Sequence, residues 1–201
     1  MATCHGIDAE TFRTACEQAP AAEANTLVDE ALAQSCPSPD GKADGLGEFA
    51  FVTSCRVALL GGFLVEKMRN PDSAPLADEI KTELRPYFGT IVDEARVHWN
   101  ATLLDDWPIF HVKDVFMDVG AQTFGTHVFA KDADSGRTVL SMLAHELTHA
   151  KQAERFGGVY SFTGEYCRAF YRARFSYDDN ALEVEARAEE EHIMGCVSGG
   201  C

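Results

Sequence analysis

The sequence predicts an α+β fold, with helices at both ends of the chain and short strands between them. Residues 1–90 place apolar side chains at the three- and four-residue intervals of helices, and residues 96–130 contain short segments rich in β-branched and aromatic side chains. Residues 138–156 and 180–192 return to helical patterns, and residues 158–177 are expected to connect them. We therefore expect a helical N-terminal region over residues 1–90 and a mixed domain over residues 91–201.

The N-terminal region is interpreted as a helical cap or support, because it carries no catalytic pattern. Residues 7–35 predict two short helices, and the turn-rich residues 37–47 predict a linker. The apolar run Phe49–Lys67 predicts a long, largely buried helix, because an arginine and two glycines interrupt it too strongly for a membrane span. A further helix from Leu76 to about Glu83 is expected to end before Pro86.

Three segments after residue 90 favour short strands. Residues 96–99 and 109–117 are rich in β-branched and aromatic side chains, and a turn at residues 105–108 separates them. Residues 123–130 form the clearest strand pattern, and a loop rich in Asp and Gly follows them. We expect these segments to form a small sheet beside the helices that come next.

The most informative pattern is formed by His145, Glu146 and His149, spaced as H-E-x-x-H inside a helix predicted over residues 138–156. The residues that can cap the start of this helix are Asp132, Asp134, Ser135 and Thr138. Residues four apart share one face of a helix, so the two imidazoles can reach one metal ion, and Glu146 can act on a water beside it. The helix is apolar, and unpaired polar groups are costly there. Two core histidines bonded to carbonyl groups would give the same pattern, but a metal site explains it better.

A catalytic zinc takes three protein ligands, and the third is expected from the helix predicted over residues 180–192. Helical projection places Glu185 and Glu189 on its inward face, where an unpaired charge is unfavourable. Glu185 is therefore predicted as the third ligand, and Glu189 as the acceptor of a ring N–H from a ligand histidine. Glu183 competes for the ligand position, and His192 can line the site or stabilise an oxyanion. The alternative is an acidic helix face that is only solvated.

The H-E-x-x-H motif and the downstream Glu-Ala pair at 185–186 resemble the gluzincin zinc peptidases, the thermolysin-like clan. The run from Leu143 to Gln152 and the preceding residues 123–129 resemble, more specifically, small metallopeptidase-like domains associated with extracellular contractile injection systems and bacterial toxins. The resemblance covers roughly residues 92–193. It implies a zincin-like domain, in which a small mixed sheet packs on the H-E-x-x-H helix and on a glutamate-bearing helix. It also implies that His145, His149 and Glu185 bind zinc and that Glu146 is the general base.

The leading functional prediction is a metalloendopeptidase with one Zn²⁺ per chain and a peptide or protein substrate. Imidazole and carboxylate ligands with an open position suit zinc best, with manganese or iron as alternatives. The resemblance implies that the strand at residues 123–130 pairs with an extended substrate. Tyr166 and Tyr171 are candidates for stabilising the transition state. A second prediction is a weakly active or inactive zinc-binding module of a larger secretion or toxin assembly, and a third is a disulfide-stabilised helical protein without metal.

Composition restricts the partners and the compartment. A net charge of −15 disfavours nucleic acid and anionic membranes as partners. The first residues show no secretory signal, while seven cysteines are many for a reducing compartment and favour an exported protein. We expect up to two disulfides within the N-terminal half and one among the remaining cysteines, the two sets being Cys4, Cys16, Cys36 and Cys55, and Cys167, Cys196 and Cys201.

Overall fold

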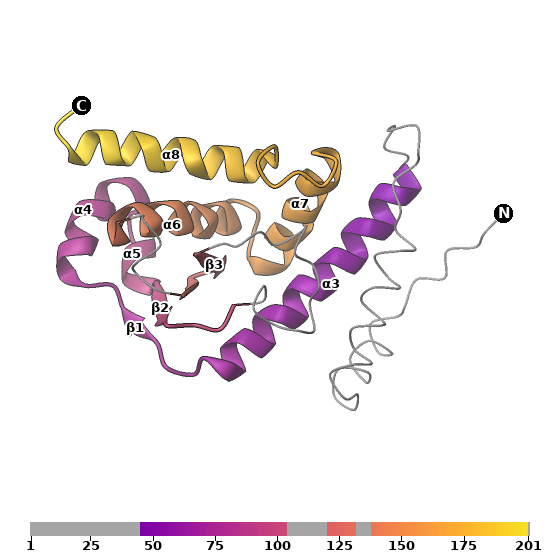
Figure 1. Ribbon diagram of the computed structural model, residues 1–201, viewed down its shortest axis with the longest axis horizontal. Coiled ribbons are helices and arrows are strands. Elements are labelled where there is room, and N and C mark those ends of the chain that lie inside the picture. Colours follow the sequence, from indigo (N-terminus) through magenta and orange to yellow (C-terminus); the bar gives the residue numbers. More distant parts are fainter. Residues whose placement is uncertain (1–44, 104–119, 132–137, 201) are drawn as a thin grey trace.

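A computed structural model of the 201-residue chain describes residues 45–103, 120–131 and 138–200 (Figure 1). The helices predicted over residues 7–35 and the strand predicted over residues 109–117 lie outside the described residues. The described part is a mixed α+β structure, as predicted. Its elements in chain order are α3 (Gly45–Arg69), β1 (Ala74–Pro75), α4 (Asp78–Phe88), α5 (Ile91–Glu94), β2 (Arg96–Trp99), β3 (Ala121–Phe124), β4 (His127–Ala130), α6 (Val139–Arg155), α7 (Val159–Arg172) and α8 (Ala181–Val197).

The four strands form one small mixed sheet in the order β1-β2-β4-β3. β2 and β4 pair in parallel, and the other two pairs are antiparallel. The predicted single strand over residues 123–130 is wrong, because β3 and β4 form a hairpin that turns at Gly125. Gly125 has a φ of +63°, and a Cβ there would lie 2.8 Å from a side-chain carbon of Val159. β3 therefore forms an edge of the described sheet.

Helix α6 lies between the sheet and α8, so both of its sides are covered (Figure 1). Thr138 begins the helix by accepting a hydrogen bond from the Ser141 backbone N–H, which confirms a predicted start signal. Residues 142–150 are all buried. The apolar residues around α6 form one core with the sheet, α4 and α5, and it includes Val97, Val128, Leu143, Leu147 and Ile193.

A second core lies on the other face of the sheet, where α3 packs against α7 (Figure 1). A disulfide between Cys55 and Cys167 joins these two helices across 112 residues of sequence. The expectation that Cys55 pairs within the N-terminal half is therefore wrong. Cys196 is also disulfide-bonded. Sequence spacing could not identify the pair, because the helices that bring the two sulfurs together are far apart in the chain.

Helix α3 is confirmed but is less buried than predicted, because only one of its faces packs on α7. Phe49, Leu64 and Met68 are exposed. By length and apolar composition, Gly47–Arg69 is the one helix among the described residues that could cross a membrane, and core helices of soluble proteins meet the same criterion.

Two other helices differ from the sequence prediction. Helix α4 continues past Pro86 to Phe88, because the buried side chains of Leu84 and Phe88 hold its last turn in the core. Helix α7 occupies a segment that the sequence analysis treated as a connection. Its buried residues include Phe162 and Phe170, spaced eight apart on one helical face.

Candidate metal centre

Helix α6 brings His145 and His149 to one point, as the four-residue spacing predicts. Both imidazoles are buried, because the helix is covered by the sheet on one side and by α8 on the other. Their Nε2 atoms lie 3.2 Å apart. Two ring nitrogens that face each other at this distance repel unless a proton or a metal ion lies between them.

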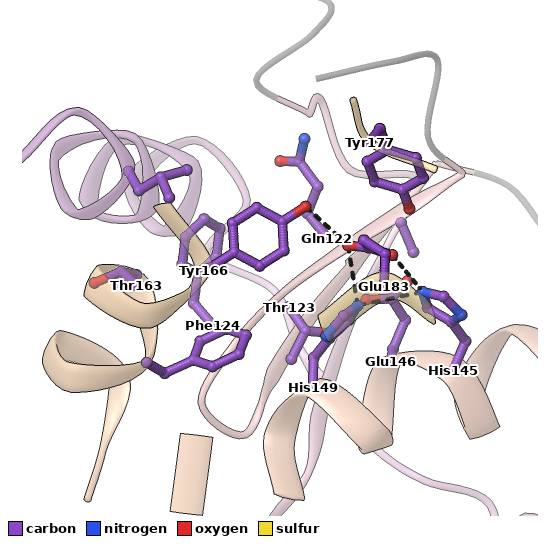
Figure 2. A pocket seen from close by; sticks show the side chains of 13 residues that line it. Gln122, Thr123, Phe124, His145, Glu146, His149, Thr163, Tyr166, Tyr177 and Glu183 are labelled. Atoms are coloured by element: carbon purple, nitrogen blue, oxygen red, sulfur yellow. Dashed lines mark hydrogen bonds and ion pairs between the residues drawn. The ribbon is translucent and has the colours of Figure 1, made fainter. Parts of the chain in front are cut away.

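Glu183, in the first turn of α8, completes the cluster (Figure 2). One of its carboxylate oxygens lies 3.2 Å from His145 Nε2, and the other lies 3.4 Å from His149 Nε2. Asn180 fixes this turn, because its side chain accepts a hydrogen bond from the Leu182 backbone N–H. His145, His149 and Glu183 are all buried, and together they could hold a metal ion.

The spacing of these donor groups suits a small metal ion. A zinc ion with bonds of about 2.0–2.1 Å places its ligand atoms roughly 3.3 Å apart. The two imidazole nitrogens lie 3.2 Å apart, and each lies 3.2 or 3.4 Å from one of the two Glu183 oxygens. One donor atom can be taken from each residue so that all three lie within 4.8 Å of one another, which leaves them close enough to share one ion.

The electrostatics of the cluster favour a cation. Burial alone would lower the pKa of His145, but its interactions with Glu183 and Glu190 outweigh burial and raise that pKa to about 9. Burial alone would raise the pKa of the Glu183 carboxyl, but His149 and His145 hold it far below its ordinary value. The interactions that favour a proton on His145 would equally favour a metal ion in its place.

The predicted ligand Glu185 does not reach this centre. Its carboxylate accepts two hydrogen bonds from the Arg155 guanidinium, at 2.6 and 2.9 Å, and one from Gln152. Glu189 is likewise directed away, and it lies 3.4 Å from Lys151 Nζ. The helical projection selected the wrong glutamates, and Glu183, the competing candidate, holds the position expected of Glu185.

Glu190 takes the supporting role that was predicted for Glu189. Its Oε2 lies 3.3 Å from His145 Nδ1, and its Oε1 accepts a short hydrogen bond from Ser141 Oγ. Glu190 lies seven residues after Glu183, so two turns of α8 bring both carboxylates to the same side. No local pattern favours this pair, because α8 also carries Glu185, Glu189 and Glu191.

Glu146 lies beside the cluster and faces the same pocket. Its Oε2 accepts a hydrogen bond of 2.7 Å from Thr123 Oγ1, and both side chains are buried. Thr123 belongs to β3, so the edge strand and the metal-binding helix are joined at this point. The pocket is mainly apolar away from the polar cluster, and its lining includes Leu59, Phe124 and Phe162.

Two tyrosine hydroxyls also point toward Glu183 (Figure 2). Tyr166 on α7 donates a hydrogen bond of 2.8 Å to Glu183 Oε1. Tyr177 lies just before α8 and lines the same pocket, with its hydroxyl directed toward Glu183. Burial, followed by the nearby Glu183 charge, raises the pKa of both tyrosines, so both hydroxyls keep their protons at neutral pH.

The two other proposed oxyanion stabilisers lie elsewhere. Tyr171 is packed in the core between α3 and α7, where its ring contacts those of Phe51 and Phe175. His192 is exposed near Tyr87. Tyr177, in contrast, was overlooked by the sequence analysis. Its place four residues before the first residue of a ligand-bearing helix is the signal that could have found it.

Residues 75–157 match the family model of the eCIS core domain, a name that refers to extracellular contractile injection systems. The match begins at β1 and ends just after α6, so it includes His145, Glu146 and His149 but not Glu183. No curated protein and no solved structure matches the chain significantly. The Cys55–Cys167 disulfide and the injection-system domain both fit an exported protein.

Proposed function

We propose that the chain is a zinc-dependent endopeptidase with a zincin-like domain. The observation that carries this proposal is the buried triangle of His145, His149 and Glu183, with Glu146 beside it in a pocket. Two imidazoles and one carboxylate suit zinc, with a free position left for solvent. A bound zinc ion would supply Lewis acidity, lowering the pKa of water and polarising the carbonyl of the substrate.

Glu146 is the proposed general base. It accepts a proton from the attacking water and later delivers that proton to the nitrogen of the leaving amine, so the residue ends the reaction in its starting state. Thr123 supports this role, because its hydroxyl donates to Glu146 Oε2 and leaves Oε1 available for the proton. The hydrogen bond also fixes the direction of the carboxylate toward the pocket.

Tyr177 is the proposed donor to the oxygen that gains negative charge in the transition state. Tyr166 already donates to Glu183 Oε1, so the Tyr177 hydroxyl can turn toward a substrate oxygen without leaving that carboxylate unpaired. A neutral phenol is suited to this task, because it donates a hydrogen bond and carries no competing charge.

The substrate is proposed to be an extended peptide segment that pairs with β3. Residues Ala121–Phe124 all line the pocket, and β3 has one neighbour within the described sheet. The backbone N–H and C=O groups along a strand edge can hold a peptide main chain. Thr123 on this strand bonds to Glu146, so the proposed general base lies beside the edge, where the scissile bond would be presented.

A direct test measures peptide cleavage by the zinc-loaded protein and by its Glu146→Gln variant. Gln keeps the acceptor for Thr123 but cannot take a proton. We expect mass spectrometry of a peptide library to show internal cleavage by the wild type and none by the variant, with one zinc per chain in both. Identical products from both proteins, or none from either, would contradict the proposal.

The eCIS core domain match supports a second candidate function, that of a component within a contractile injection system. In this alternative, the metal centre holds α6 against α8 and does not catalyse a reaction. The same experiment separates the two functions, because a structural module binds zinc and cleaves nothing. A structural module should also assemble into injection-system particles when it carries Glu146→Gln. This assembly would be the positive test of the second function.

A further inference from the structure

Gln152 is the third residue after His149 on α6, and it is one of the buried polar side chains through which α6 contacts the start of α8. It is 1% exposed. Its amide makes three hydrogen bonds, to His149, to Leu182 and to Glu185. Neither the family resemblance nor the helical projection assigned it a role.

The orientation of the Gln152 amide follows from its partners. Its Nε2 lies 3.0 Å from the Leu182 backbone oxygen and 3.2 Å from a carboxylate oxygen of Glu185. Both partners are acceptors only, so the amide NH₂ group must face them. The amide oxygen therefore faces the remaining partner, His149 Nδ1, at 2.9 Å.

This orientation fixes the tautomer of His149. An amide oxygen can only accept, so His149 Nδ1 must carry a hydrogen. The neutral ring then has its lone pair on Nε2, the nitrogen that lies 3.2 Å from His145 Nε2 and 3.4 Å from Glu183. The acceptors of Leu182 and Glu185 thus determine, through Gln152, which nitrogen of His149 faces the metal.

We propose that Gln152 is a positioning residue that holds His149 ready to bind metal, and this role rests on the metal centre of the proposed function. Glu185 and Arg155 form an outer layer, because the Arg155 guanidinium fixes the Glu185 carboxylate that in turn orients the amide. The bond to Leu182 adds a second effect, since Leu182 precedes Glu183. One side chain therefore aligns a ligand of α6 with a ligand of α8.

The two ligand histidines are held in different ways. His145 Nδ1 lies near the charged Glu190, whereas His149 Nδ1 contacts a neutral amide. A carboxylate can accept a proton from a histidine, but an amide cannot. Gln152 therefore fixes the tautomer without adding another negative charge to a cluster that already contains Glu146, Glu183 and Glu190.

The test measures the zinc dissociation constant of Gln152 variants by competition with a chromophoric chelator. Gln152→Met keeps the length of the side chain but accepts no strong hydrogen bond. Loss of such a partner typically weakens metal binding by about 10- to 100-fold, and we expect that loss here. Thr148→Val is the matched control, because Thr148 is equally buried on the same helix and bonds only to the Ala144 carbonyl among the contacts described.

Gln152→Glu separates positioning from a merely structural role. Its carboxylate still accepts from His149 Nδ1, but it cannot donate to Leu182, and it repels Glu185. We expect this variant to keep near-wild-type zinc affinity while its thermal stability without metal falls. Parallel losses of affinity and stability in both Gln152 variants would overturn the proposal. So would a Gln152→Met affinity equal to that of Thr148→Val. A wild type that binds no zinc would instead overturn the proposed function itself.

Discussion

Two pairs of histidines in this protein have nearly the same internal spacing but opposite surroundings. His145 and His149 face each other at 3.2 Å, and His98 and His127 face each other at 3.0 Å. The first pair is surrounded by carboxylates. The second pair is bonded at one end to the Asn70 carbonyl, 2.7 Å from His98 Nδ1, and at the other to Lys67 Nζ, 3.3 Å from His127 Nε2.

The surroundings decide what each pair can do. In the second pair, every ring nitrogen has a partner that fits neutral imidazoles. His98 donates to Asn70, His127 donates to His98, and the Lys67 ammonium donates to His127. His98 is also stacked on Phe129, with ring centroids 4.3 Å apart. A cation at one end disfavours a metal, whereas the carboxylate of Glu183 attracts one. In this protein, the anionic third group therefore distinguishes the candidate metal centre from the other histidine pair.

The largest expected difference between the two histidine pairs is in the amount of bound zinc. His145→Gln is expected to abolish stoichiometric zinc binding, because it removes one corner of the ligand triangle. His98→Gln, the matched change in the other pair, is expected to keep one zinc per chain. Elemental analysis after dialysis against trace zinc measures both. Full zinc content in the His145 variant would show that the two pairs had been assigned the wrong roles.

The disulfide connects the two regions, because α3 carries Lys67 and α7 carries Tyr166. Its 112-residue separation predicts that replacing Cys55 and Cys167 by serine lowers the free energy of unfolding by about 4 kcal/mol. Urea denaturation of the double variant and of the oxidised wild type measures this change. A difference below about 1 kcal/mol would mean that the α3–α7 core is held by packing alone.

Tyr177→Phe tests the proposed transition-state donor beside the carboxylate-rich pair, His145 and His149. Removing one donor to a transition-state oxygen typically lowers kcat by roughly 10²-fold, and we expect that loss with zinc content unchanged. Tyr171→Phe is the control, because Tyr171 lies in the α3–α7 core outside the pocket. Steady-state cleavage of one peptide by the three proteins gives the comparison. Equal losses in both variants would remove Tyr177 from the proposed mechanism.

The smallest effect is expected at the second pair and concerns pH. Burial, followed by the charges of Lys67, His98 and Arg96, lowers the pKa of His127 below its ordinary value of 6.5. Its contribution to stability is therefore fully present above pH 6.5 and is lost as pH falls through the folded-state pKa. Between about pH 7.5 and pH 5, the free energy of unfolding should decline, and His127→Gln should make that decline shallower. Urea denaturation at several pH values in this range measures it. An unchanged slope would contradict the assignment.

The sequence was most informative where one element determines the site. Helix α6 was predicted with its cap region, and the four-residue spacing correctly placed His145 beside His149. Helix α8 was predicted as an element, but its inward face was not. Leu182, Ala186 and Ile193 lie on both the predicted and the observed faces, whereas glutamates occur all around the helix. With little apolar contrast to set the rotation, only the packing against α6 decides which carboxylate points inward.

Features that depend on contacts between distant segments were also missed, because the sequence does not show which elements pack together. The Cys55–Cys167 pair requires the packing of α3 on α7, and the bond between Thr123 and Glu146 requires the hairpin to lie against α6. Neither arrangement leaves a local pattern. Gln152 is different, because its three-residue spacing from His149 is a helical-face signal that was present in the sequence.

The choice between Glu183 and Glu185 tests the central claim most directly. We would measure zinc by elemental analysis in the wild type, Glu183→Gln and Glu185→Gln. The structure predicts about one zinc per chain in the wild type and the Glu185 variant, and little in the Glu183 variant, because Glu183 faces both histidines while Glu185 bonds to Arg155. Full zinc content in Glu183→Gln together with its loss in Glu185→Gln would contradict the account.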